Sequence, residues 1–235
     1  MLPGPEAAQA GLLTAATPGK IMDAPQIKYR EKLAAHLIKK LNQRRMAASF
    51  APTAAQAREE VVDMIPSGAL VSRCGSMSLV EMGLWEALAR KSGVEIINPF
   101  APGVGPEEAY ALMRRGLTAD FLISSSNALT MDGRLVNLDA TGNRLAAMCF
   151  GPEKVILVVG LNKVTPDLES AMARVKQLAA PINAIRLNRE TPCAETGQCA
   201  DCRSPGRLCN LWSIIEGHRD ENRIHVKLVG EDLGY

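Results

Sequence analysis

The alternation of apolar and polar positions along the chain predicts helices that take turns with short aliphatic strands. Apolar residues recur near helical spacing over 25–45 and again over 54–64, with charged residues between them. Thr53 is suited to cap the second helix, and Pro66 ends it. Further helices are predicted over 79–90, from 105 onward and over 167–178.

Short aliphatic runs predict the strands of a sheet. They lie at 69–71, 93–97, 121–123, 135–138, 155–159 and 224–229. Because these strands alternate with helices, we expect an α/β fold with a mostly parallel sheet that has helices on both faces. The Asp132-Gly133 pair predicts one antiparallel hairpin inside that sheet.

The length of 235 residues suits one full-sized hydrophobic core. We expect a flexible tail over 1–24, rich in Ala, Gly and Pro, and a single α/β domain over 25–235. This domain begins with an N-terminal helical extension and contains a C-terminal cysteine-rich loop over 190–212. No apolar run has the length of a membrane span, and the first residues lack the basic start of a secretory signal. We therefore expect a cytoplasmic protein.

The charge balance argues against nucleic acid as a partner. The chain has 27 Lys and Arg against 25 Asp and Glu, a net charge of +2, whereas nucleic-acid binders carry a strong basic surface. Aromatic residues make up 4% of the chain, which favours helices packed on an aliphatic sheet over a β-sandwich with aromatic anchors.

The strongest chemical signal is a group of four cysteines near the C-terminus. Cys193, Cys199, Cys202 and Cys209 follow the spacing C-x5-C-x2-C-x6-C. Glycine and proline residues between them let the chain reverse direction, so that four thiolates can surround one metal centre. In a reducing compartment such a group favours metal ligation, and two disulfides or four unrelated thiols are the alternative.

The spacing favours an iron–sulfur cluster over zinc. Structural zinc sites with four cysteines usually contain two C-x2-C pairs, and this loop contains one. The first three cysteines approach the plant-type C-x4-C-x2-C arrangement. We expect an iron–sulfur cluster, with zinc as the alternative. The nuclearity stays open, because the spacing suggests two irons and the compact span suits four.

A second candidate site is the turn that contains Gly75, Ser76 and Ser78. It joins a strand to a helix and presents backbone N–H groups and hydroxyls to an anion. Ser78 could instead cap the helix, with Glu81 completing a capping box. Cys74 precedes the helix start, where the macrodipole would lower the pKa of its thiol, although a lone cysteine beside a strand is more often a small buried hydrophobe.

A third constellation follows two other strands. Arg144 is suited to bind a phosphate or carboxylate, and Asn127, Asp139 and Asn143 are suited to bind hydroxyls. In open α/β sheets, ligands bind at the carboxyl ends of strands, so we expect a small anionic metabolite here. The alternative is that these residues only form turns. The sequence contains no convincing nucleophile and base pair, so it assigns no independent enzyme activity.

Several strings together resemble the lactate-utilization (LUD) domain family, over roughly residues 25–235. The matching segments are 74–83, 125–130, 139–144, 151–152, 160–163 and 229–235. The family commonly has Gly-Gly-Ser where Cys74, Gly75 and Ser76 stand, and Asp-Gly where this chain has Asp139 and Ala140. The bulkier side chain at position 74 restricts the approach of a ligand.

The resemblance implies both a fold and a function. It implies a Rossmann-like sheet similar to that of the ribose-phosphate isomerase and CoA-transferase group, in which a turn like 75–78 meets phosphate or CoA groups. It also implies association with iron–sulfur oxidoreductase systems that convert L-lactate to pyruvate. The cysteine loop resembles that of a subset of LUD proteins.

Two hypotheses of different classes follow. In the first, the chain is an iron–sulfur electron-transfer or accessory subunit of an oxidoreductase acting on L-lactate or a similar 2-hydroxy acid, and its partners are other iron–sulfur subunits. In the second, it is a non-catalytic metabolite-binding or regulatory module in which zinc holds the C-terminal loop. Either form could be a homo-oligomer.

Overall fold

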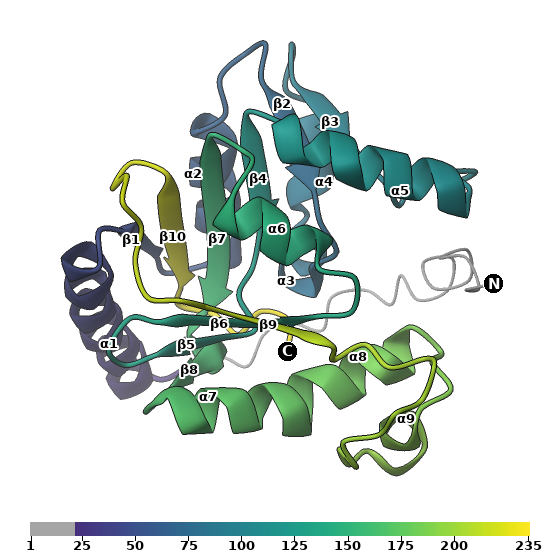
Figure 1. The fold of residues 1–235 in the computed structure, drawn as a ribbon. Helices are drawn as coiled ribbons and strands as arrows, with labels where there is room; N and C mark the ends of the chain where they lie inside the picture. Colours follow the sequence, from purple (N-terminus) through teal and green to yellow (C-terminus); the bar gives the residue numbers. More distant parts are fainter. Residues whose placement is uncertain (1–21) are drawn as a thin grey trace.

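The computed structural model describes residues 22–235, and a parallel sheet forms its centre (Figure 1). In spatial order the sheet contains β1 (Ala47–Ala51), β10 (Ile224–Val229), β7 (Lys154–Gly160), β4 (Phe121–Ser124), β2 (Leu70–Arg73) and β3 (Glu95–Ile97). Every neighbouring pair in this sheet is parallel. The predicted α/β fold is therefore confirmed.

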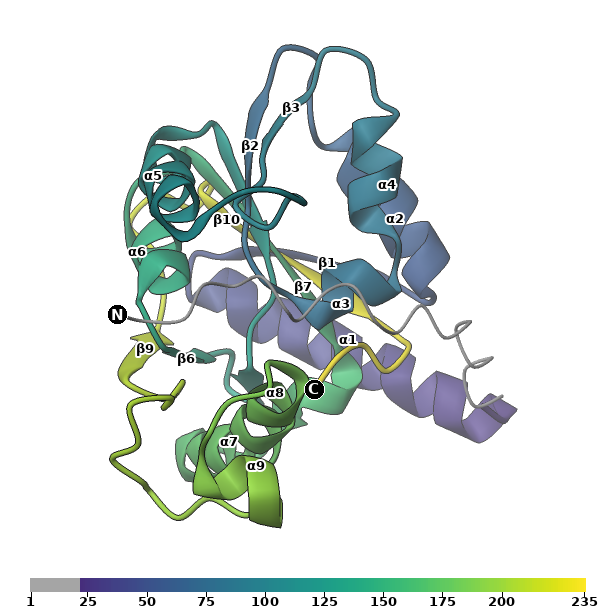
Figure 2. The same cartoon turned by 90° about the vertical axis from the view of Figure 1, so that its right-hand side faces the viewer.

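Helices cover both faces of the parallel sheet, as the alternation of strands and helices predicted. On β7, Val155, Leu157 and Val159 face a core that includes α1 (Ala24–Gln43) and α6 (Asn143–Cys149). The residues between them face a second core, formed with α2 (Ala54–Asp63), α3 (Met77–Glu81) and α4 (Leu84–Ala89). Figure 2 shows α2 and α4 on one side of the sheet and α6 with α5 (Pro106–Arg115) on the other. Because β7 is buried on both faces, its sequence is a continuous run of apolar residues.

The hairpin at Asp132-Gly133 is present, but its predicted place inside the parallel sheet is wrong. It joins β5 (Ala128–Thr130) to β6 (Leu135–Asp139) in a second sheet, whose order is β8 (Val164–Thr165), β5, β6 and β9 (Leu211–Ile215). The physical reason is that β4 already pairs with β2 on one side and β7 on the other. The chain after β4 therefore has no free edge there and must leave the sheet.

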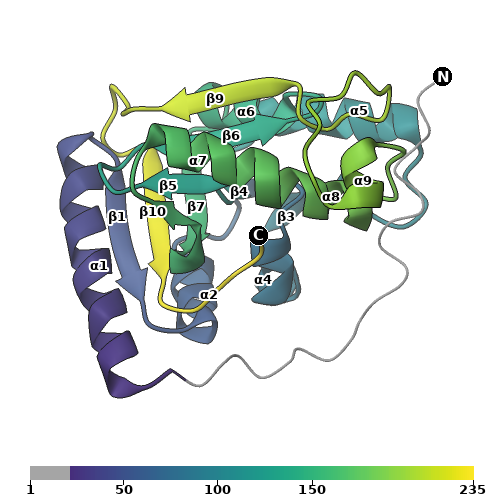
Figure 3. The ribbon, with the colours of Figure 1, turned by 90° about the horizontal axis from the view of Figure 1, so that it is seen from below.

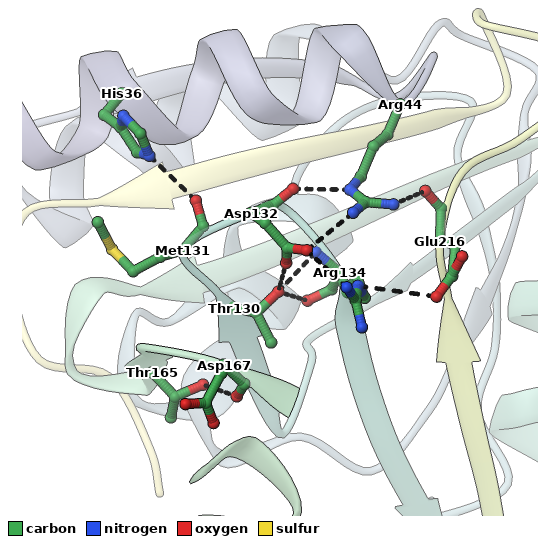
Figure 4. Close-up of polar contacts among 9 residues, drawn as sticks. All are labelled: His36, Arg44, Thr130, Met131, Asp132, Arg134, Thr165, Asp167 and Glu216. Carbon is green, nitrogen blue, oxygen red and sulfur yellow. Dashed lines mark hydrogen bonds and ion pairs between the residues drawn. The ribbon is translucent and has the colours of Figure 1, made fainter. Parts of the chain in front are cut away.

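Polar contacts fix the turn of this hairpin against α1 and β9 (Figure 4). Arg44, just after α1, donates to the Asp132 carbonyl at 2.6 Å and to its carboxylate at 2.9 Å. Arg134 pairs with the same carboxylate at 2.8 Å, and Arg44 also reaches the Glu216 carbonyl at 2.8 Å. The second sheet is thus held in a defined place beside the parallel sheet.

Two predicted helices differ from the structure. The helix predicted over 79–90 divides into α3 and α4, because Gly83 adopts the left-handed conformation with φ +66°. The helix predicted over 167–178 continues as α7 (Leu168–Arg174), a π-helical turn (Val175–Ala179) and α8 (Ala180–Arg186).

Other parts of the chain were not predicted or lie outside the described residues. The elements absent from the prediction are β1, β5, α6, β8, α8, β9, α9 (Pro192–Thr196) and the short 3-10 turns η1 (Gly116–Thr118) and η2 (Leu161–Lys163). Of the predicted tail over 1–24, residues 1–21 lie outside the described part of the chain. Asp23 is the N-cap residue of α1, which begins at Ala24. Within 22–235, no helix has the length and apolar character needed to cross a membrane.

Candidate functional site

Three segments that carry polar residues meet at the carboxyl edge of the parallel sheet. Because β7, β4 and β2 are neighbours and parallel, the chain segments that follow them lie side by side. They contain Lys163 after β7, Ser125 after β4 and Ser78 after β2. This edge is where open α/β sheets bind ligands.

Lys163 lies between two serine hydroxyls at this edge. Its Nζ donates to Ser78 Oγ at 2.7 Å and to Ser125 Oγ at 3.1 Å, and the two hydroxyls are 3.4 Å apart. The lysine is 3% exposed and the serines 1% and 3%. In the described part of the chain no carboxylate forms an ion pair with Lys163. The site therefore holds a basic nitrogen that water does not reach.

The surroundings disfavour the charged form of this lysine. Burial is the main cause, followed by the positive charges of Arg174 and Arg144, while Glu81 acts in the opposite direction. Together they lower the pKa of Lys163 to about 7. Near neutral pH the side chain can therefore both accept and release a proton.

The structure brings together three of the predicted ligand-binding residues beside Lys163. Arg144 donates through Nε and Nη2 to Asp139 Oδ1 at 2.9 and 2.7 Å, and through Nη2 to Asn127 Oδ1 at 2.8 Å. Its other nitrogen reaches the Ser125 carbonyl at 3.4 Å, which connects this group to the lysine. Asp139 Oδ2 is buried and has no hydrogen-bond partner within residues 22–235.

The remaining predicted ligand residues are less closely connected. Gly75 is exposed, and Ser76 is the N-cap residue of α3 without a capping hydrogen bond from its side chain. Asn143 begins α6 and is half-buried. The alternative in which Ser78 caps the helix is wrong, because Ser78 lies inside α3 and binds Lys163, while the Glu81 carboxylate accepts the Gly234 N–H at 2.6 Å.

Lys163 and Arg174 belong to the site although the sequence analysis did not select them. Arg174 on α7 donates to the carbonyls of Asn127 at 2.7 Å and Asn162 at 3.4 Å. A lone lysine has no motif, but one signal was present. Lys163 follows the most apolar strand of the chain and stands between Leu161 and Val164, a position with little water.

The closing segment, residues 230–235, covers the site. Its Leu233 carbonyl accepts from Ser78 Oγ at 3.2 Å, and its Gly234 carbonyl accepts from Asn162 Nδ2 at 3.1 Å. Arg30 on α1 holds this segment through the Gly230 carbonyl at 2.5 Å and through Asp232 at 2.7 Å. Figure 3 shows the chain end near α8, where the Tyr235 hydroxyl accepts from Arg186 at 2.6 Å.

A cavity of about 350 Å³ lies next to this covered site. Tyr29, Arg30 and Leu33 of α1 line one side of it, and Leu161 and Val164, which flank Lys163 in the chain, line the other. Arg30 thus borders the cavity and also holds the closing segment.

The four loop cysteines are free thiols, and the loop that contains them lies beside α8 and α9 (Figure 1). Cys193, on α9, shares a small cavity with Cys202 and Cys209 that α8 borders through Ala180 and Ala184. Cys199 is not among the residues that line this cavity. Within 22–235, no three His, Cys, Asp or Glu side chains are gathered closely enough to hold a metal ion.

Two cations lie beside these thiols. Lys176 Nζ is 3.7 Å from Cys209 Sγ, and Arg207 donates to the carbonyls of Cys202 and Cys209. Asp201 links the two cations with ion pairs of 3.0 Å each. Cysteine thiolates are the ligands of iron–sulfur clusters and of structural zinc, so the chemistry of this donor set fits either metal centre.

The environment of Cys74 differs from the prediction that a helix start lowers the pKa of its thiol. Burial raises the pKa of Cys74 to about 12, with a smaller opposing effect of Arg144. The following helix, α3, has only five residues, so its dipole is weak. Cys74 packs in the core with Leu122 and Leu157, as a small hydrophobe does.

The fold and the polar cluster at its carboxyl edge define an α/β domain of the Rossmann-like class. The LUD domain model matches residues 34–229, and the chain therefore belongs to the LUD domain family, which is associated with lactate utilization. Among solved structures, the chain is similar to a DUF162 family protein from Deinococcus radiodurans, with 12% identity and a TM-score of 0.48. That match covers 85% of this chain and 96% of the other. The comparison with curated proteins finds no match.

Proposed function

We propose that the protein is an iron–sulfur electron-transfer or accessory subunit of an oxidoreductase that acts on L-lactate or a similar 2-hydroxy acid. Membership of the LUD domain family supports the link to lactate utilization. The observation that carries the redox role is that four cysteines lie in one loop, where Lys176 Nζ is 3.7 Å from Cys209 Sγ and Arg207 donates to the Cys202 and Cys209 carbonyls.

The four cysteines are the proposed ligands, and the cluster would supply one-electron transfer when bound. The four thiols would draw together as the cluster forms, because within residues 22–235 no three of them are close enough to hold a metal ion. All four thiols are half-buried, so the site is close to the molecular surface and open to partner subunits that carry iron–sulfur clusters. Lys176 and Arg207 would offset the negative charge of the thiolates.

Metal analysis of anaerobically purified protein tests this function. We expect brown protein with stoichiometric iron and acid-labile sulfide. The Cys202→Ser variant is expected to lose most of both, because it lacks one thiolate ligand. The matched control is Cys149→Ser, which changes an exposed cysteine outside the loop and keeps the iron content of the wild type.

A second candidate is a metabolite-binding or regulatory module with a structural zinc ion. The Asn127–Asp139–Arg144 network favours it, because hydrogen bonds hold these side chains in fixed positions without any redox centre. Colourless protein with stoichiometric zinc and no sulfide would support this candidate and contradict the first. This second candidate also predicts that the Arg144→Ala variant loses binding of the metabolite.

A further inference from the structure

The charges around Lys163 leave room for an anion. Arg144, on α6, is neutralised by its ion pair with Asp139. Arg174, on α7, forms hydrogen bonds only with carbonyl oxygens within the described residues, so its positive charge is not paired with an acid there. From α3, Glu81 acts on Lys163 from a distance, while its carboxylate accepts the Gly234 N–H. When Lys163 is protonated, the three positive charges of Lys163, Arg144 and Arg174 therefore exceed the two negative charges of Asp139 and Glu81.

The donors at this position are arranged for oxygen acceptors. Ser78 Oγ donates to the Leu233 carbonyl, and Asn162 Nδ2 donates to the Gly234 carbonyl, so two uncharged peptide oxygens occupy these places. A carboxylate is a stronger acceptor than a peptide carbonyl, especially beside an ammonium group. A carboxylate in place of these two peptide carbonyls would accept the same hydrogen bonds and would also neutralise the positive charge of Lys163.

We propose that Lys163, Ser78 and Ser125 bind the carboxylate of a small 2-hydroxy or 2-oxo acid, which displaces the closing segment from the site. This inference rests on the proposed function and names the carboxylate-binding residues of that same site. Its central evidence is that Lys163 is 3% exposed, that its amine lies between two hydroxyls, and that it lacks an ion-pair partner within the described chain.

Binding at this site takes up a proton. The pKa of Lys163 is lowered to about 7, so most of the side chain is neutral at pH 8. A bound carboxylate favours the charged ammonium and raises this pKa again. At pH 8 the complex therefore gains on the order of one proton per ligand.

Isothermal titration with L-lactate and pyruvate, at pH 8 in two buffers of different protonation enthalpy, measures this proton uptake. We expect the apparent binding enthalpy to differ between the buffers. The Lys163→Met variant is expected to lose roughly tenfold or more in affinity and to lose the buffer dependence, because the ion pair and the titrating group are both removed.

The matched control is Lys154→Met, at the opposite end of β7, where the lysine donates to the Asn222 carbonyl. This variant should bind and take up protons as the wild type does. Ser125→Ala serves if Lys163→Met fails to fold, and it should weaken binding while keeping the proton uptake.

Two results would overturn the inference. One is binding of either acid by Lys163→Met with the wild-type affinity, and the other is wild-type protein that binds neither acid. The Cys202→Ser variant separates this outcome from the proposed function, because it should lose iron and still bind the acid. Failure of acid binding in protein that contains iron and sulfide would leave the redox role standing.

Discussion

Lys163 shows how one residue controls the charge of a site. Its amine is buried between Ser78 and Ser125, and the nearby guanidinium groups of Arg144 and Arg174 repel a proton from it. The residues with polar turn chemistry, such as Asn127 and Arg144, could be selected from the sequence. Lys163 was not selected, because its apolar neighbours in the sequence are a weak signal, and its burial becomes definite only when the surrounding strands are placed.

The low pKa of Lys163 makes stability depend on pH. Between about pH 7 and the ordinary lysine pKa of 10.5, the unfolded chain binds this proton and the folded chain does not. The free energy of unfolding therefore rises with pH in this window, by at most about 1.4 kcal/mol per pH unit from this group. Urea denaturation at pH 7 and pH 9 should show this rise to be smaller in Lys163→Met than in wild type. Equal pH dependence in both proteins would contradict the assigned pKa.

At the scale of elements, the predictions succeeded where the apolar pattern was strong. The strands β7 and β10 and the helix α1 follow it closely. The strand β1 was missed because its sequence, Ala-Ala-Ser-Phe-Ala, has no β-branched residue, and its strand form comes from pairing with β10. The hairpin was predicted from Asp132-Gly133. Which of the two sheets contains it depends on the pairing of β4 with β2 and β7, and the sequence does not show this pairing.

The turn of the hairpin offers a test of how tightly the second sheet is held. Gly133 has φ +91°, and a Cβ there would lie 3.1 to 3.2 Å from the α1 backbone at Lys40 and Leu41. Gly133→Ala should lower the free energy of unfolding by about 2–3 kcal/mol, because backbone strain and a close contact add together. The control Gly103→Ala, with φ +83° and open space around it, should cost about 1 kcal/mol. Equal losses in denaturant unfolding would contradict the role assigned to this contact.

At the scale of the whole molecule, the cysteine loop is an addition beside the α/β core. None of its four cysteines belongs to the two cores that flank the parallel sheet, and Cys209 only packs against a smaller cluster under the second sheet. The sequence could give the four ligands of a metal site, since spacing is local information. It could not place Lys176 and Arg207 beside them, because these contacts depend on how the loop folds against the π-helical turn and α8.

The separation between loop and core has a measurable consequence. In chelator-treated protein, changing Cys193 and Cys202 to Ser should alter the free energy of unfolding by no more than about 0.5 kcal/mol, because neither thiol contributes to a core. Denaturant titration of both proteins measures this difference. A loss of several kcal/mol would show that the loop is part of the folding unit.

The redox role is tested most directly by the visible and electron paramagnetic resonance spectra of the anaerobic protein before and after reduction with dithionite. An iron–sulfur cluster in the loop predicts visible absorbance that bleaches on reduction and returns on oxidation, with a paramagnetic signal in one of the two states. The Cys149→Ser protein should behave in the same way, and the Cys202→Ser protein should lack the response. Wild-type protein whose spectra contain no iron–sulfur signal and do not change on reduction would contradict the electron-transfer function.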